Sequence, residues 1–264
     1  MTREFPVLPL GETNNHIIFA SGAKRVLVDT GAGTSVSDES AWSFMGQPRP
    51  LISRYLGADC DRISQLVGTR VDILMGNDIF KDLDFRIDLD QLKIVFSSEL
   101  LDGPGEMLPG QAWVLDGSIK GRSVRTLVDT GAKLSYLSRK VAVWADLQEV
   151  GQARDFWPPY GEFETPIFNC TLNLGNRKAE FPVGILPVEV DRGLFHLVDA
   201  FIGVDLLKLG AMTFSLRSGH LIADWACEAA QASDRPPAPE AFLPREDLRT
   251  SPVGAGLKIT PALT

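Results

Sequence analysis

The sequence Leu-Val-Asp-Thr-Gly-Ala occurs twice in this chain of 264 residues, and this repeat constrains the fold more than any other feature. The two aspartates, Asp29 and Asp129, are 100 residues apart. Each copy is followed by an apolar residue, Gly-x-Asp and two more apolar residues, with the glycines at Gly76 and Gly203. The same two motifs in the same order indicate two similar structural units in one chain.

The residues around the motifs predict a β-rich unit. Apolar runs separated by a turn lead into each aspartate, with the turns at Ser21-Gly22 and around Gly121. This pattern is typical of strands joined as hairpins. Residues 61–68 and 138–151 instead place apolar side chains at helical spacing and end at a glycine, which predicts two short helices. The expected fold class is all-β with a few short helices.

A segment rich in glycine and proline, residues 101–110 (LDGPGEMLPG), separates the two units. We therefore predict an N-terminal lobe over residues 1–100 and a C-terminal lobe over residues 101–227. Residues 228–264 are rich in proline, alanine and charged residues and show little periodicity, so we expect them to form a flexible tail.

Composition excludes several classes of partner. The formal net charge is −8 and the basic residues are scattered, which argues against binding to nucleic acid or an anionic membrane. No apolar run approaches the roughly 18 residues of a membrane span, and residues 1–19 lack the continuous apolar region of a secretory signal. The three cysteines and three histidines are dispersed, so we expect no disulfide framework, metal or cofactor. A cytoplasmic location follows as an expectation.

A carboxylate at the end of a buried strand is costly unless it is hydrogen-bonded or paired. One Asp-Thr-Gly alone is weak evidence, because aspartate and glycine also form ordinary turns. Two copies related by a pseudo-twofold axis would bring the two carboxylates together.

The paired motifs, Asp-Thr-Gly at 29–31 and 129–131 with Gly-x-Asp at 76–78 and 203–205, resemble the aspartic proteases, and more specifically the retropepsin-like group. The resemblance covers roughly residues 10–226. It implies a bilobal, pseudo-twofold acid-protease barrel fold with both halves fused in one chain. It also implies an aspartic endopeptidase that acts on polypeptide substrates as a monomer, an internal pseudo-dimer. Viral members carry an arginine where this chain has Asn77 and Val204, so another contact must brace that loop.

The resemblance assigns roles to the motif residues. Asp29 and Asp129 would share one proton, and the ionised member would activate a water while the protonated member polarises the scissile carbonyl. The supporting positions are Thr30 and Thr130, which would hydrogen-bond to the opposite loop, Gly31 and Gly131, which allow the tight turn, and Gly76 and Gly203, which allow a strand to pass close behind the catalytic loop.

The residue after each motif bears on the pH optimum. Ala32 and Ala132 lack the hydroxyl that pepsin-like enzymes usually place there. A hydroxyl that donates to a carboxylate lowers its pKa. Without it, we predict an optimum at mildly acidic or neutral pH.

The second unit has a longer interval between its motifs than the first, 74 residues against 47, which leaves room for a β-hairpin flap. We predict its tip near Trp157, Tyr160 and Gly161, as flap and substrate-binding residues. No alternating hairpin pair is evident in the first interval, so we predict a single flap on the C-terminal lobe. The competing interpretation is that Trp157 and Tyr160 simply pack on the barrel.

Two other functions stay open. The chain could be a non-catalytic peptide-binding module that retains the aspartic protease fold, although two facing carboxylates are of no use to a binder. Alternatively, Phe242 and Leu243 in the tail could occupy the cleft and limit activity in cis.

Overall fold

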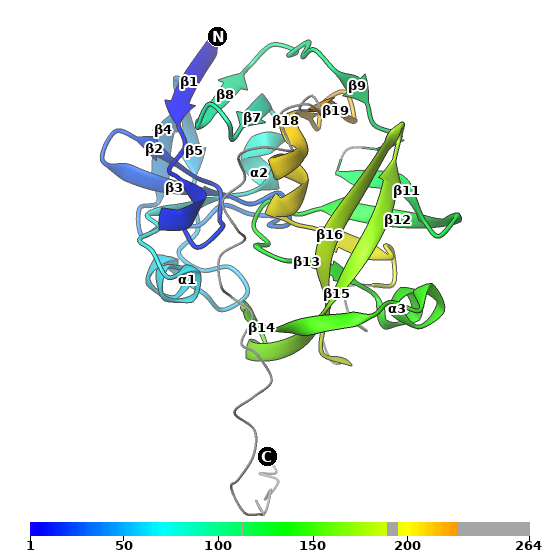
Figure 1. The fold of residues 1–264 in the computed structure, drawn as a ribbon. Coiled ribbons are helices and arrows are strands. Elements are labelled where there is room, and N and C mark those ends of the chain that lie inside the picture. Colours follow the sequence, from blue (N-terminus) through cyan, green and yellow to red (C-terminus); the bar gives the residue numbers. More distant parts are fainter. Residues whose placement is uncertain (112, 189–194, 226–264) are drawn as a thin grey trace, which may run out of the picture.

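The computed structural model describes residues 1–111, 113–188 and 195–225 (Figure 1). The tail over residues 228–264, with Phe242 and Leu243, lies outside these ranges. Strands are the main secondary structure of the described chain and the helices are few and short, which confirms the predicted fold class. The strands are β1 (Thr2–Pro6), β2 (Ile18–Ser21), β3 (Lys24–Val28), β4 (Ala41–Phe44), β5 (Gln47–Pro50), β6 (Ile73–Met75), β7 (Asp84–Asp88), β8 (Lys93–Ser97), β9 (Glu106–Met107), β10 (Gly110–Gln111), β11 (Val114–Ile119), β12 (Arg122–Val128), β13 (Ser135–Leu137), β14 (Glu149–Trp157), β15 (Gly161–Leu174), β16 (Arg177–Ile185), β17 (Ala200–Ile202), β18 (Gly210–Ser215) and β19 (His220–Trp225).

The helices are short. They are α1 (Cys60–Val67), α2 (Asn77–Phe80) and α3 (Arg139–Ala145), with single 3-10 segments η1 (Leu10–Glu12) and η2 (Val204–Leu209). The α1 helix begins where the Asp59 carboxylate accepts from the Arg62 N–H, and it ends at Gly68 in the left-handed conformation, close to the predicted bounds. The prediction for residues 138–151 was wrong at its C-terminal end. The α3 helix stops at Ala145 because Asp146 takes a left-handed conformation, and Glu149 onward belongs to β14.

Strands from both halves of the chain share one six-stranded sheet, in the order β1-β8-β7-β18-β19-β9. It runs along the top of Figure 1. Aromatic rings pack at its centre, where Phe85 of β7 and Phe214 of β18 stack with centroids 4.7 Å apart. The two halves therefore share this sheet and a continuous apolar core.

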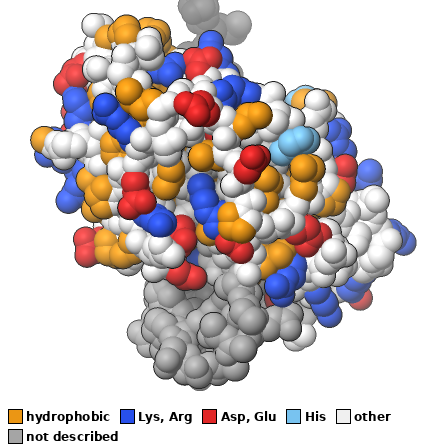
Figure 2. Space-filling model, turned by 90° about the horizontal axis from the view of Figure 1, so that it is seen from above, with side chains coloured by type: hydrophobic (Ala, Val, Ile, Leu, Met, Phe, Trp, Pro, Cys, Tyr) orange, Lys and Arg blue, Asp and Glu red, His pale blue; other side chains and the backbone are white. Residues whose placement is uncertain are grey.

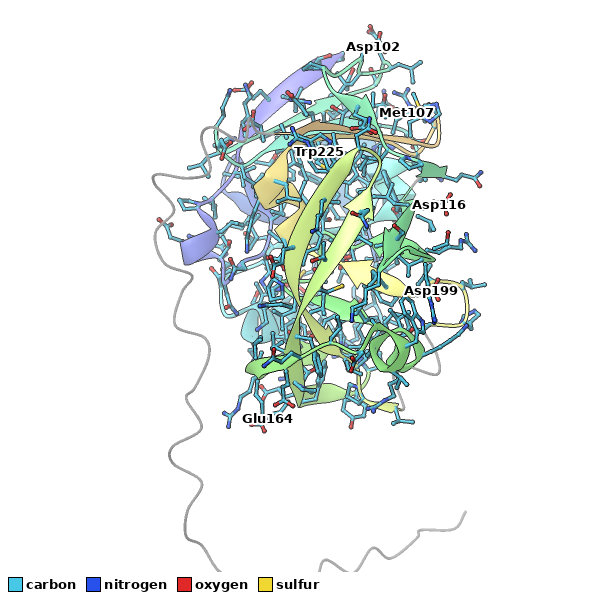
Figure 3. The ribbon with its side chains drawn as sticks, turned by 45° about the vertical axis from the view of Figure 1, so that its right-hand side comes forward. Asp102, Met107, Asp116, Glu164, Asp199 and Trp225 are labelled. Atoms are coloured by element: carbon cyan, nitrogen blue, oxygen red, sulfur yellow. The ribbon has the colours of Figure 1, made fainter. Side chains whose placement is uncertain are left out.

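The two motif-bearing strands have equivalent surroundings. In the three-stranded sheet β2-β3-β6, β3 pairs with β6 in parallel. In the eight-stranded sheet β10-β11-β12-β17-β13-β16-β15-β14, β12 pairs with β17 in parallel. A further repeated contact marks this equivalence, since Asp72 accepts from the Arg25 N–H at 2.8 Å and Asp199 accepts from the Arg125 N–H at 3.0 Å. Asp199 is labelled in Figure 3.

The first half contains a hairpin that the sequence analysis missed. Strands β4 and β5 pair in an antiparallel two-stranded sheet, so the expectation of no hairpin in this interval was wrong. Trp42 and Phe44 of β4 are buried and stack at 4.2 Å, and the Phe44 ring contacts Phe96 of β8. The hairpin therefore belongs to the core and does not reach over the two aspartates.

The described surface carries both signs of charge. Figure 2 shows acidic, basic and hydrophobic side chains interspersed on the face that it presents. Among the described helices, none combines the length and apolar character needed to cross a membrane.

Candidate active site

Asp29 and Asp129 lie at equivalent positions, immediately after β3 and β12. The Asp29 N–H donates to the Met75 carbonyl of β6 at 3.0 Å, and the Asp129 N–H donates to the Ile202 carbonyl of β17 at 2.9 Å. Each aspartate is thus held at the C-terminal end of a parallel strand pair. In each half, the Asp-Thr-Gly motif therefore lies next to the Gly-x-Asp motif that follows it in the sequence.

Thr30 and Thr130 form a reciprocal set of four hydrogen bonds between the two loops. The Thr30 N–H donates to Thr130 Oγ1 and the Thr130 N–H donates to Thr30 Oγ1, both at 3.0 Å. Each hydroxyl then donates across to a carbonyl of the opposite strand, Val128 at 2.7 Å and Val28 at 2.8 Å. Both threonines are 1% exposed. This set joins the two aspartate loops with near-twofold symmetry.

The loop glycines place each carboxylate against the opposite loop. The Gly31 and Ala32 N–H groups donate to Asp29 Oδ1 at 2.9 Å, and the Gly131 N–H donates to Asp129 Oδ1 at 3.0 Å. A Cβ built on Gly31 would lie 2.6 Å from Cγ of Asp129. Gly131 has the same relation to the Asp29 carboxylate. Glycine is therefore required at both positions for the two carboxylates to face each other.

Burial raises the pKa of both aspartates. The pKa of Asp29 is raised well above its usual value, first by burial and then by the neighbouring Asp129 charge. Burial also raises the pKa of Asp129, and hydrogen bonds from the Gly131 N–H and from Asp29 partly offset this. Like charges this close do not both ionise readily, so the titrations of the two carboxyl groups are coupled.

Gly76 and Gly203 lie directly behind the aspartate loops. A Cβ on Gly76 would lie 2.8 Å from the Ala32 carbonyl oxygen, and a Cβ on Gly203 would lie 2.9 Å from the Leu134 carbonyl oxygen. These contacts are with backbone atoms, which side-chain rotation cannot relieve. The element that follows each glycine is a helix, α2 or η2, and not the strand that the sequence analysis expected there.

Two serines brace this approach, and the sequence analysis did not identify them. Ser35 Oγ accepts from the Gly76 N–H at 2.9 Å and donates to Asp78 at 2.6 Å. Ser135 accepts from the Gly203 N–H at 3.2 Å and contacts Asp205 at 3.4 Å. The available signal was a serine six residues after each motif aspartate.

Asn77 supplies a contact that braces this loop, as the sequence analysis expected for its position. Its amide donates to the Thr30 carbonyl at 2.9 Å, and the Trp113 indole N–H donates to its Oδ1 at 2.8 Å. The equivalent residue in the second half, Val204, is fully buried in the apolar core. The two halves therefore stabilise this loop differently, with hydrogen bonds in the first half and apolar packing in the second.

A cavity of about 120 Å³ opens over the two aspartates. One wall is apolar and comes from the first half, including Leu27, Ile63 and Leu74. The opposite wall comes from the second half, including Phe163 and Phe201. The carboxyl pair thus lies at the floor of a largely apolar cleft.

The hairpin of β14 and β15 reaches this cavity from the second half. Its residues Phe156, Trp157 and Pro158 line the cavity, and Phe156 packs against the apolar cluster of the first half. Strand β15 runs unbroken to the turn at residues 175–176, and beyond that turn it pairs with β16. Figure 3 shows Glu164 of this hairpin at the opposite end of the molecule from Asp102 and Met107.

The hairpin tip separates the predicted flap residues. Trp157 lines the cavity, whereas Tyr160 is 47% exposed and does not. Gly161, with φ +99°, forms the turn at the start of β15. The Trp157 carbonyl accepts from the Tyr160 N–H at 2.9 Å, which closes the turn.

The first half also contributes a small loop to the cavity. Tyr55 and Ala58 exchange two backbone hydrogen bonds, and the residues between them, Leu56 and Gly57, both have positive φ. The Gly33 N–H donates to the Tyr55 hydroxyl at 3.2 Å. Tyr55, Leu56 and Ala58 line the cavity, so this turn faces the β14–β15 hairpin across the cleft.

The described residues contain no cluster of three or more histidine, cysteine, aspartate or glutamate side chains placed to hold a metal ion. The two described cysteines, Cys60 and Cys170, are free and buried.

Comparison with known proteins gives a likeness of fold. No family model and no curated protein sequence matches the chain. Among solved structures, the aspartic proteinase from Irpex lacteus is similar, with 11% sequence identity and a TM-score of 0.47 over 85% of this chain and 98% of that chain. The geometry of the two aspartate loops, not this likeness, defines the site.

Proposed function

We propose that this protein is a single-chain aspartic endopeptidase of the retropepsin-like type, with Asp29 and Asp129 as its catalytic pair. The observation that supports this most is the reciprocal hydrogen bonding of Thr30 and Thr130, which holds two carboxyl groups face to face. Such an arrangement is costly to a fold, because it buries two acidic groups that repel each other. A catalytic role accounts for that cost.

The chemistry follows from one shared proton. The ionised carboxylate takes a proton from a water bound between the two groups, and that water attacks the carbonyl carbon of the peptide bond. The protonated carboxyl gives its proton to the carbonyl oxygen as charge develops on it, which yields a tetrahedral diol. When the C–N bond of the diol breaks, the carboxyl that took the proton from water passes it to the leaving amine. The other carboxylate takes a proton back from a diol hydroxyl, so the products are a carboxylic acid and an amine and the pair again holds one proton. Gly31, Ala32 and Gly131 hold the carboxyl groups in place through their N–H groups.

The cleft supports a polypeptide substrate. Apolar walls on both sides of the carboxyl pair fit apolar side chains next to the bond that is cleaved. The β14–β15 hairpin, with Trp157, acts as the flap that excludes water from the closed site. Since one chain provides both aspartates, we propose that the monomer is the active species and works in a cytoplasmic, near-neutral environment.

The test is cleavage of an unfolded protein substrate by the wild type, Asp29→Asn and Asp129→Asn. Each substitution keeps the shape of the side chain and removes its acid–base chemistry. Loss of turnover in both variants, and inhibition by a statine-type transition-state analogue, is the expected result. Turnover that persists in either variant contradicts the proposal.

A further inference from the structure

The largely apolar cleft also contains a polar corner. His16, Lys133 and Asp155 all line the same cavity as the two catalytic aspartates. His16 is 1% exposed, and its ring stacks on Phe156 of the hairpin, with centroids 6.4 Å apart and planes at 24°. None of these residues has a role in the chemistry proposed above.

His16 has one ring nitrogen without a hydrogen-bond partner. Its Nδ1 lies 3.1 Å from the Thr13 carbonyl oxygen, which can only accept, so Nδ1 carries the hydrogen. Burial lowers the pKa of His16, which keeps the ring neutral at neutral pH. The other nitrogen, Nε2, is then a bare acceptor, and it is buried with no hydrogen-bond partner. A buried polar atom without a partner is rare and calls for an explanation.

Lys133, in contrast, has hydrogen-bond donors that lack an acceptor. Its ammonium lies 3.6 Å from Asp155 Oδ1, and its side chain is 18% exposed. Asp155 pairs with this ammonium and also accepts from the Tyr136 hydroxyl at Oδ2 and from the Phe156 N–H at Oδ1, the latter at 2.9 Å. Among the described residues, no acceptor lies within hydrogen-bond distance of the Lys133 ammonium. Its donors therefore remain available to a ligand in the cleft.

Both groups lie against the same stretch of the β14–β15 hairpin. His16 stacks on Phe156, and Lys133 pairs with the adjacent Asp155, and all four residues line the cavity. The position equivalent to Lys133 in the first half is Gly33, which carries no side chain. The cavity thus has a donor and an acceptor near the same stretch of β14, and the first half supplies no side chain equivalent to Lys133.

We propose that His16 and Lys133 form a subsite that selects a side-chain carboxamide, glutamine or asparagine, in the bound polypeptide. The amide oxygen accepts from the Lys133 ammonium, and the amide NH₂ donates to His16 Nε2. A primary carboxamide carries both groups side by side, whereas a trans main-chain peptide carries them on opposite sides. A carboxylate has no hydrogen to give to Nε2. This inference rests on the proposed function of the cleft as a peptide-binding site.

The test is peptide binding to the inactive Asp29→Asn protein by isothermal titration calorimetry. Three peptide series move a single glutamine, methionine or glutamate through the positions that flank a central apolar pair. At one position we expect the glutamine peptide to bind about tenfold tighter than the other two, which are close to it in size. Equal binding of glutamine and methionine peptides at every position, or no peptide binding at all, overturns the subsite.

Two variants identify the groups responsible. Lys133→Met in the same background should abolish the glutamine preference, while Lys140→Met, an exposed lysine on α3, should retain it. If Lys133→Met keeps the full preference, the assignment is wrong. Should Lys133→Met fail to fold, the ranking of the three peptides by the parent protein still decides.

Wild-type cleavage of the same peptides separates this inference from the proposed function. Cleavage with no glutamine preference overturns the subsite and leaves the endopeptidase standing. Glutamine-selective binding with no cleavage supports the subsite and overturns the endopeptidase.

Discussion

Replacing Thr30 with valine tests whether the reciprocal threonine contacts hold the two halves together. Valine keeps the shape of threonine and removes the hydroxyl, so the Thr130 N–H and the Val128 carbonyl each lose a partner. Leaving a buried polar group unsatisfied costs about 1–3 kcal/mol. Two such groups give a loss of about 2–6 kcal/mol in the free energy of unfolding. Thr130→Val should cost a similar amount, because its two bonds mirror those of Thr30.

The chain offers a matched control for this experiment. Thr126 of β12 is also fully buried, but its hydroxyl has no hydrogen-bond partner. Thr126→Val should therefore leave stability unchanged or raise it by about 1 kcal/mol. Urea unfolding at fixed pH, followed by tryptophan fluorescence, measures all three variants. Equal losses for Thr30→Val and Thr126→Val would show that the reciprocal hydrogen bonds contribute nothing beyond the packing of the side chain.

Three further results are expected. Gly203→Ala should lower the free energy of unfolding by about 1–3 kcal/mol, because its Cβ would meet backbone carbonyls; Gly11→Ala, with open space around it, serves as the neutral control in the same urea series. Ala32→Ser places a hydroxyl beside the carboxyl pair and should move the acidic limb of the pH–activity profile down by about one unit; an unchanged limb would show that this hydroxyl does not reach the pair. Trp157→Ala should reduce kcat/KM about tenfold or more with little change in Tm, while the exposed Tyr160→Ala should change neither by much; parallel loss of activity and Tm in Trp157→Ala would mean that the tryptophan only packs on the barrel.

The expected pH optimum follows from the direction of the pKa shifts. The proposed mechanism needs one proton on the carboxyl pair. Activity should therefore fall when the pair loses that proton and when it gains a second. Burial raises the pKa of both Asp29 and Asp129, which moves both limits to higher pH. This direction agrees with an optimum at mildly acidic or neutral pH.

The aspartate loops were predictable because the residues that form each loop are adjacent in the sequence and occur twice. Each loop needs a strand, a short polar turn and a glycine, and these occur as adjacent letters in both copies. The serines at Ser35 and Ser135 were equally visible as repeats, but their function depends on a strand that arrives some 40–70 residues later. A repeat shows that a position matters without showing what it contacts.

The errors arose where tertiary contacts override local pattern. In β5, prolines at Pro48 and Pro50 argue against a strand, yet they fit because β4 is its only partner in a two-stranded sheet. Beyond α3, Leu147 and Val150 continue a helical spacing, but Asp146 has already ended the helix. The polar corner was beyond prediction, because His16, Lys133 and Asp155 come from three separate parts of the sequence and line one cavity only in the folded chain.

The most direct test of the central claim is the rate of peptide-bond cleavage in the wild type, Asp29→Asn and Asp129→Asn between about pH 4 and 7.5. Each variant should be checked for an unchanged fold by circular dichroism. The account predicts that both single substitutions abolish turnover and that a statine-type analogue inhibits the wild type. A wild type as inactive as its variants, with a peptide that binds more tightly once either carboxylate is gone, would show that the cleft binds peptides without cleaving them.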